Sequence, residues 1–175
     1  MYKEAIKALT EKACASIRYR TRKEILEENP NIKDYLDEIL NDRRVEYVLS
    51  WQRPNGFLGQ ILHGGRIPKV KGYTYSTATG AEGALRFLHE MGIPKTYPVV
   101  EKGLKALLKD NWINQDKSLI DKTNYQLRTT WLTLYKPEIG LFGPDHVRAV
   151  LFAYFGIEEH DFIQTEIKRA FGYVN

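Results

Sequence analysis

Residues 81–108 read AEGALRFLHEMGIPKTYPVVEKGLKALL, and this stretch indicates the fold class. Its apolar residues recur at helical spacing on both sides of the pair Gly92-Ile93. They are Ala81, Ala84, Leu85, Leu88 and Met91 before the pair, and Tyr97, Val100, Leu104, Leu107 and Leu108 after it. A glycine directly after such a stripe is typical of a residue that ends a helix in a left-handed conformation. The stretch therefore predicts two helices joined by a short turn.

Residues 145–172 read DHVRAVLFAYFGIEEHDFIQTEIKRAFG and repeat this pattern, with Gly156-Ile157 in place of Gly92-Ile93. At that offset apolar residues fall on apolar residues. The aligned pairs are Leu88 and Phe152, Met91 and Phe155, Val99 and Ile163, Ala106 and Ala170, and Leu107 and Phe171. We expect the hairpins at 80–110 and 144–172 to superpose on each other.

Helical spacing extends over most of the remaining chain, without convincing alternation typical of strands. Stripes run through Tyr2, Ile6, Leu9, Ala13 and Ile17, through Ile32, Tyr35, Leu36, Ile39 and Leu40, through Val45, Val48, Leu49 and Gln52, and through Leu127, Trp131, Leu134 and Tyr135. The pair Asn29-Pro30 predicts a helix start. The sequence predicts an all-α fold of αα-hairpin repeats in one domain. N-terminal helices occupy 1–40, a first repeat 41–110 with a long loop at 52–80, and a second repeat 121–173.

Composition limits the class of protein. The chain has 175 residues, of which 43% are hydrophobic and 27% charged, enough for one core and too apolar for a disordered protein. No apolar run is long enough to span a bilayer, and the charged N-terminus does not resemble a signal peptide. The single cysteine, Cys14, favours a reducing compartment and is expected to be a small buried hydrophobe. We expect a soluble, cytoplasmic protein.

The net charge of +4 is concentrated in one segment. No acidic residue occurs between Glu46 and Glu82, whereas Arg53, Arg66, Lys69 and Lys71 fall there, together with six of the 13 glycines. Long irregular loops in compact domains tend to be functional or disordered. The segment is therefore either a binding loop or a flexible solvent loop whose cations pair with acids such as Asp42, Glu46 or Glu82.

Both repeats follow a Trp-containing helix and a turn rich in proline and glycine, WQRPNGFLG at 51–59 and KPEIGLFG at 136–143. With the two hairpins, these turns resemble the helical repeats of the terpenoid cyclase and protein prenyltransferase superfamily, the α/α-toroid. Gln52, Gly56 and Phe57-Leu58 match that family's Gln-x-x-x-Gly-x-aromatic turn, and the second copy lacks the glutamine. The resemblance covers about residues 41–175 and implies a partial toroid: a truncated piece, a half-toroid or a distant relative.

The family's catalytic motifs are absent. Asp34-Tyr35-Leu36-Asp37 does not match the Asp-x-Asp-Asp motif that protonates squalene, and the zinc ligands of the prenyltransferases are missing. The histidines have no metal-ligand spacing, so neither a metal nor a cofactor is expected. Glu82 could act as a base, but Thr79-Gly80-Ala81-Glu82 also fits a capping box. We assign no residue a catalytic role.

The candidate binding residues lie in the basic segment. His63-Gly64-Gly65-Arg66 combines backbone amides with two side chains that donate charge-assisted hydrogen bonds. The candidate ligand-binding residues are Trp51, Arg53, His63, Arg66, Lys69, Tyr73 and Tyr75. The aromatic members could instead belong to the core.

Three functions follow from these observations. The first is a helical-repeat protein that binds an anionic small molecule, of prenyl-phosphate or glycan type, in an electropositive pocket lined by the loop, and that forms part of a toroid enzyme. The second is a scaffold that binds another protein. The third, nucleic-acid binding, is weaker, because the charge is balanced outside one loop and no nucleic-acid motif occurs.

Overall fold

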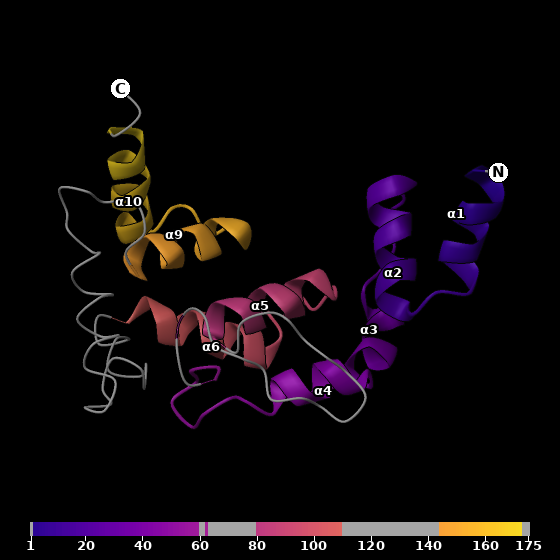
Figure 1. Cartoon of the computed structure of the whole chain (residues 1–175), viewed down its shortest axis with the longest axis horizontal. Coiled ribbons are helices and arrows are strands. Elements are labelled where there is room, and N and C mark those ends of the chain that lie inside the picture. The colour runs from indigo at the N-terminus through magenta and orange to yellow at the C-terminus, as the bar shows by residue number, and fades with distance from the viewer. Residues whose placement is uncertain (1, 60–61, 63–79, 110–143, 173–175) are drawn as a thin grey trace.

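A computed structural model describes residues 2–59, 62, 80–109 and 144–172 (Figure 1). These residues form eight α-helices and one π-helical turn and contain no strand, which confirms the all-α prediction for the described part. The elements are α1 (Tyr2–Glu11), α2 (Ala15–Arg20), the π-helical turn η1 (Thr21–Ile25), α3 (Lys33–Leu40), α4 (Arg43–Leu49), α5 (Ala81–Glu90), α6 (Pro98–Leu108), α9 (Pro144–Tyr154) and α10 (Asp161–Gly172).

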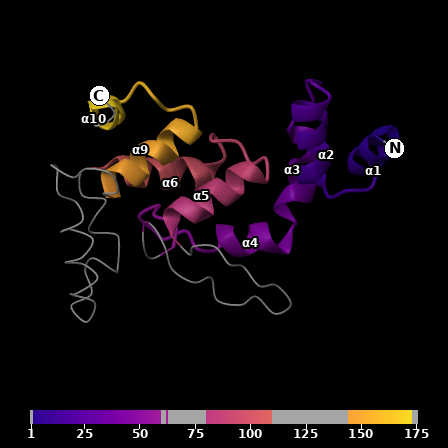
Figure 2. The same ribbon diagram turned by 45° about the horizontal axis from the view of Figure 1, so that its top comes forward.

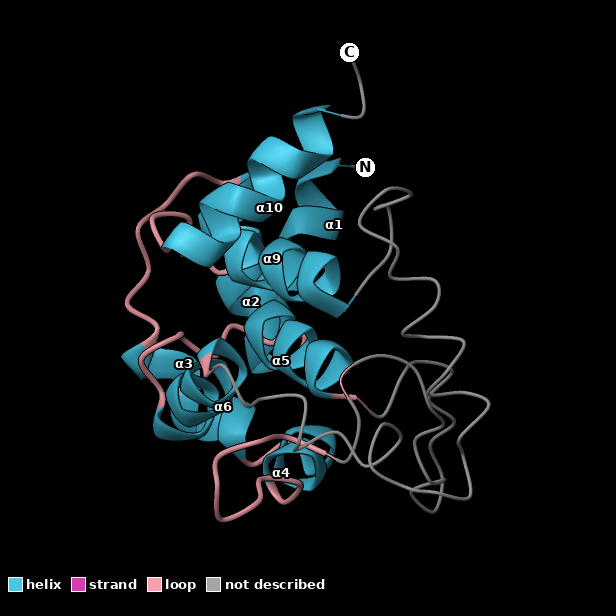
Figure 3. Ribbon diagram, turned by 90° about the vertical axis from the view of Figure 1, so that its left-hand side faces the viewer, coloured by secondary structure: helices cyan, strands magenta, loops and turns pink. Residues whose placement is uncertain are grey.

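The helices form two groups that α4 connects. Helices α1, α2 and α3 pack on one another at the N-terminal side, and α5, α6, α9 and α10 pack on one another at the other side (Figures 1 and 2). In the second group α9 lies between α5 and α10, while α5 also contacts α4 and α6 (Figure 3). The arrangement leaves the ends of α5 and α9 facing the N-terminal helices.

The core belongs mainly to the second group. Leu85 and Leu88 of α5, Leu107 of α6, Phe152 of α9 and Ile163 of α10 are all fully buried. Helical periodicity therefore identified these core positions, whereas Phe171, which the repeat aligns with the buried Leu107, is 67% exposed.

Both hairpins turn through the same hydrogen-bonded motif. The Gly92 N–H donates to the His89 carbonyl at 2.9 Å and the Ile93 N–H to the Leu88 carbonyl at 3.0 Å. Gly156 and Ile157 repeat this pattern at 2.9 Å in both bonds, donating to the carbonyls of Ala153 and Phe152. Both glycines have positive φ, +92° and +64°, as expected for a Schellman motif. The predicted helix ends are confirmed.

The turn after α4 is fixed against α6. The Gln52 side-chain amide donates to the Val99 carbonyl at 2.8 Å and to the Gly56 carbonyl at 3.3 Å. Gly56 has a φ of +93°, and a Cβ there would lie 2.8 Å from the Lys102 carbonyl oxygen. Phe57 is completely buried. This turn therefore positions α4 relative to the first hairpin.

The N-terminal region differs from the sequence expectations. The stripe from Tyr2 to Ile17 is divided between α1 and α2, because Cys14 adopts an extended conformation at the start of α2. Cys14 is exposed rather than buried. The second predicted helix begins at Lys33 rather than at Asn29-Pro30, and the Asn31 side chain accepts a hydrogen bond from the Lys33 N–H at 3.1 Å.

The predicted capping box at α5 is also wrong. Gly80, not Thr79, is the N-cap residue, and it has no side chain to cap the helix. The backbone N–H of Glu82 instead donates to the Leu62 carbonyl at 3.1 Å, and its carboxylate pairs with Arg86 at 3.5 Å.

Candidate functional site

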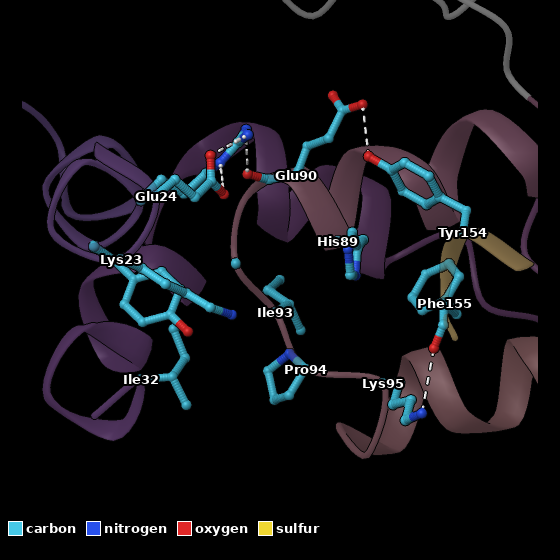
Figure 4. A pocket seen from close by; sticks show the side chains of 13 residues that line it. Lys23, Glu24, Ile32, His89, Glu90, Ile93, Pro94, Lys95, Tyr154 and Phe155 are labelled. Atoms are coloured by element: carbon cyan, nitrogen blue, oxygen red, sulfur yellow. Dashed lines mark hydrogen bonds and ion pairs between the residues drawn. The ribbon is translucent and has the colours of Figure 1, made fainter. Parts of the chain in front are cut away.

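A groove with a volume of about 370 Å³ lies between the N-terminal helices and the ends of α5 and α9 (Figure 4). One wall comes from α2, η1 and the residue before α3, and the other from the two Schellman turns. The lining residues are Tyr19, Arg20, Lys23, Glu24, Ile32, His89, Glu90, Gly92, Ile93, Pro94, Lys95, Tyr154 and Phe155.

The first wall is built on the π-helical turn. The Leu26 N–H donates to the Thr21 carbonyl at 3.0 Å, which is the wider i to i−5 pattern. Arg20 and Glu24 pair side by side, with Arg20 Nε 2.8 Å from Glu24 Oε1 and Nη2 2.9 Å from Oε2. Short π-helical segments occur frequently at functional sites. Here the segment brings Lys23 and Glu24 to the groove.

The second wall consists of two helix C-termini, and a cationic side chain meets each of them. Arg20 Nη1 donates to the Glu90 carbonyl at the end of α5 at 3.4 Å. Lys95 Nζ donates to the carbonyls of Phe155 at 3.2 Å and Gly156 at 3.5 Å, at the end of α9. Cations at these positions satisfy the last carbonyls and the negative end of the helix dipole.

The walls approach closely at the floor of the groove. A Cβ added to Gly92 would lie 3.2 Å from the Tyr19 ring and 3.5 Å from the end of Ile32. Ile93 is 1% exposed. The floor is therefore apolar, and it is closed by packing between residues that are distant in the sequence.

His89 stands in the middle of the groove (Figure 4). Its ring meets those of Tyr154 and Phe155 edge-on, with a centroid distance of 4.8 Å to each. Partial burial is the main reason that the pKa of His89 is lowered, and repulsion from Lys23 and Arg20 lowers it further. Glu90 and Glu24 raise the pKa, but by less than the two cations lower it. Lys23 and Arg20 are thus the charged side chains with the largest effect on the pKa of the imidazole.

Lys23 supplies a cation to the groove that forms no ion pair with a carboxylate of the described residues. Its Nζ lies 5.6 Å from the Tyr19 ring centroid, and the side chain extends across the groove toward Ile93 (Figure 4). Within the described residues no carboxylate forms an ion pair with Lys23, whereas Arg20 is held by Glu24.

Glu90 and Tyr154 form the opposite rim. The Tyr154 hydroxyl donates to Glu90 Oε1 at 3.1 Å. Burial raises the pKa of Tyr154, and the hydrogen bond to Glu90 raises it further. The Arg86 guanidinium lies 5.3 Å from the centroid of the Tyr154 ring. This rim presents a carboxylate and a phenol oxygen.

Of the candidate binding residues predicted from the sequence, the structure describes Trp51 and Arg53, and neither lines this groove. Trp51 is half-buried against the core and meets Tyr47 edge-on at 5.2 Å, and Arg53 lies 5.9 Å from the Phe57 ring centroid. The other candidates, His63, Arg66, Lys69, Tyr73 and Tyr75, lie outside the described residues, as does Trp131.

The sequence did not predict the groove because its residues come from four separate stretches of the chain. His89 and Tyr154 carried one usable signal, since each lies within three residues before a helix-ending glycine. Lys23 carried none, because nothing in its local pattern indicates a π-helical turn. The spatial meeting of these segments depends on how α4 and the Gln52 turn place the two groups of helices.

Comparisons with family models, with characterised proteins and with solved structures found no match. Across residues 2–59, 62, 80–109 and 144–172, no three His, Cys, Asp or Glu side chains gather in a way that could hold a metal ion. None of the helices in those ranges is long and apolar enough to cross a membrane.

Proposed function

We propose that this protein binds an anionic small molecule in the groove between the N-terminal helices and the ends of α5 and α9. The observation that carries the proposal is the position of Lys23, whose ammonium lies at the groove, 5.6 Å from the centroid of the Tyr19 ring. Lys23 has no acidic partner in the described chain, so its ammonium is available to a phosphate or carboxylate.

The apolar floor determines what the anion is attached to. Ile32, Ile93, Pro94 and Phe155 line the groove together with the Tyr19 ring. Ligand sites of this kind combine apolar and aromatic lining with a few polar groups that fix orientation. The ligand is therefore an anion on an apolar or planar body; a prenyl phosphate belongs to that class, whereas a glycan acid would place polar hydroxyl groups against the apolar floor.

The basic segment at 52–80 remains a second part of the proposal. Arg66 and Lys69 would add cations to the same ligand or form a separate anion site. The relation to the α/α-toroid enzymes is likewise a proposal, supported by the two hairpins with equal turns and by the Gln52 turn.

The test is calorimetric titration with phenyl phosphate and with 4-methylbenzoate. We expect both to bind, and Lys23→Gln to weaken binding at least tenfold. Lys33→Gln is the matched control, because Lys33 lies on α3 outside the groove. Equal weakening by both variants, or no binding to the unmodified protein, would overturn the proposal. Loss of binding only in an Arg66→Ala, Lys69→Ala double variant would move the site to the basic segment.

A protein scaffold is the second candidate, favoured by exposed apolar side chains. Tyr2 is 87% exposed, Ile25 58% and Phe171 67%, and α1 buries none of its residues. A second groove of about 350 Å³ lies between α2 and α5, with Ile17 and Ile25 on one side and Phe87 on the other. Exposed apolar surface of this kind marks interaction sites.

A further inference from the structure

The two ends of the groove differ in which hydrogen bonds they can make. At the Lys23 end the ammonium can only donate, so it selects an acceptor, preferably an anion. At the Glu90 end the ionised carboxylate can only accept. Tyr154 has a single hydroxyl proton, and that proton is already directed to Glu90 Oε1 at 3.1 Å. The phenol oxygen therefore also acts as an acceptor toward a ligand.

The backbone strengthens this difference. Glu90 is the last residue of α5, where the helix dipole is negative and favours a cation. The neighbouring cation, Arg20, is held by Glu24 through two bonds of 2.8 and 2.9 Å. Arg20 also donates to the Glu90 carbonyl at 3.4 Å, but within the described residues no cation forms an ion pair with the Glu90 carboxylate itself.

Between these ends lies a surface suited to an apolar body. The His89 ring packs edge-on against Phe155 at 4.8 Å, and Ile93 and Pro94 line the groove below it (Figure 4). A ligand that spans the groove therefore meets a donor, an apolar middle and a pair of acceptors.

We propose that the ligand is a zwitterion, with its anionic group at Lys23, its ammonium group at Glu90 and Tyr154, and an apolar body against His89 and Ile93. The chemical class is an amino acid or another amine that also carries a carboxylate or phosphate. This inference rests on the proposed anion site and adds the second pole, which makes Glu90 the specificity-determining residue.

Three probes built on the same para-substituted benzene ring test the two poles. They are 4-(aminomethyl)benzoate, which carries both charges, 4-methylbenzoate, which carries only the anion, and 4-methylbenzylamine, which carries only the cation. We expect the zwitterion to bind at least tenfold more tightly than 4-methylbenzoate in calorimetric titration.

The variant Glu90→Gln keeps an acceptor for Tyr154 but removes the charge. We expect it to reduce zwitterion affinity to that of 4-methylbenzoate, while the affinity for 4-methylbenzoate itself is unchanged or rises. Glu4→Gln, an exposed glutamate on α1, is the matched control and should leave the preference intact.

The outcomes separate the two proposals. If both benzoates bind equally to the unmodified protein, or if Glu90→Gln retains the preference, the zwitterion inference is wrong and the anion site stands. If 4-methylbenzylamine binds as tightly as the zwitterion, or if no probe binds, the anion site is wrong as well, and with it the inference that depends on it.

Discussion

Glu90 and Tyr154 end the first helices of the two hairpins, lie 64 positions apart in the sequence, and are joined by a hydrogen bond of 3.1 Å. The offset equals that between Gly92 and Gly156, so the two residues are counterparts in the repeat. The two copies of the repeat therefore contact each other through α5 and α9.

This bond predicts a measurable coupling between the hairpins. We expect Glu90→Ala and Tyr154→Phe to show a coupling energy of about 0.5 kcal/mol in a double-mutant cycle, at the low end for hydrogen bonds because both side chains are partly exposed. The measurement is urea unfolding of the two single variants and the double variant. Strictly additive effects would show that the bond does not contribute to stability.

The two helix-ending glycines predict a ranked pair of substitutions. Gly156 has nothing within 4 Å of an added Cβ, so Gly156→Ala should cost only the left-handed conformation, about 1 kcal/mol. Gly92→Ala should cost more. Residue 92 also has a positive φ, +92°, and in addition the new Cβ would lie 3.2 Å from the Tyr19 ring. Chemical denaturation measures both. Gly156→Asn is the control and should cost less than Gly156→Ala, since asparagine tolerates this conformation. The reverse order of the two alanine variants would contradict the assignment.

The opposite change is expected at Glu27, which is the non-glycine residue of the described chain with positive φ, at +53°. It follows η1 at the position that glycine occupies after α5 and α9. We expect Glu27→Gly to raise the free energy of unfolding by up to about 1 kcal/mol, because the left-handed penalty exceeds the added entropy of the unfolded chain. Glu28→Gly, without positive φ, should lower stability instead. A destabilised Glu27→Gly would contradict the backbone conformation at the end of η1.

Some of these helix ends could be predicted from the sequence and others could not. The glycines after α5 and α9 were predictable, since a local pattern of apolar stripe, glycine and isoleucine determines the turn. The conformation of Glu27 was not, because glutamate carries no preference for positive φ and η1 has no recognised pattern. The start of α3 was predicted at Asn29-Pro30, whereas the helix begins at Lys33, where the Asn31 side chain accepts a hydrogen bond from the Lys33 N–H.

The candidate site shows a second limit. The net charge along the sequence places the basic excess at 47–81, but the groove contains Lys23, whose charge is balanced in the sequence by Glu24, together with the uncharged Tyr154 and His89. The net charge of a segment does not distinguish a cation that is paired from one that only lies near an acid in the sequence. Only the placement of Arg20 against Glu24 reveals that Lys23 is left without an acidic partner in the described chain.

Glu166 predicts a pH dependence of stability. Its side chain is 5% exposed, and burial raises its pKa despite the Arg169 guanidinium at 2.7 Å. A raised folded pKa means that the native state favours the protonated acid. The contribution of Glu166 to stability is therefore greatest below the unfolded pKa of about 4.3 and falls as pH rises from there through the folded pKa. The loss is about 1.4 kcal/mol for each pH unit that separates the folded pKa from the unfolded one.

The variant Glu166→Gln removes this titration. We expect the variant to gain more stability over the unmodified protein at pH 7 than at pH 4. Thermal unfolding of both proteins at the two pH values measures this difference. Glu159→Gln, an exposed glutamate in the turn before α10, is the control and should show no such difference. A larger relative gain at pH 4 would show that the ion pair with Arg169 outweighs burial and that the pKa of Glu166 is lowered.

His89 predicts that anion binding and proton binding are linked. Burial and the cations Lys23 and Arg20 lower its pKa, and Glu90 and Glu24 oppose them only in part. A bound anion beside Lys23 offsets the repulsion from both cations, so it must raise the pKa of His89. By linkage, affinity for the anion then increases as pH falls through the range in which His89 titrates, about tenfold for each pH unit by which the pKa rises.

NMR titration of the imidazole with and without phenyl phosphate measures the pKa change, and calorimetry at pH 5.5 and 7.5 measures the affinity. Using phenyl phosphate also requires a correction for its own second ionisation, which 4-methylbenzoate avoids because its carboxylate is charged at both values. His89→Asn should bind 4-methylbenzoate with equal affinity at the two pH values, and a pH dependence that survives in that variant would exclude His89 as its origin.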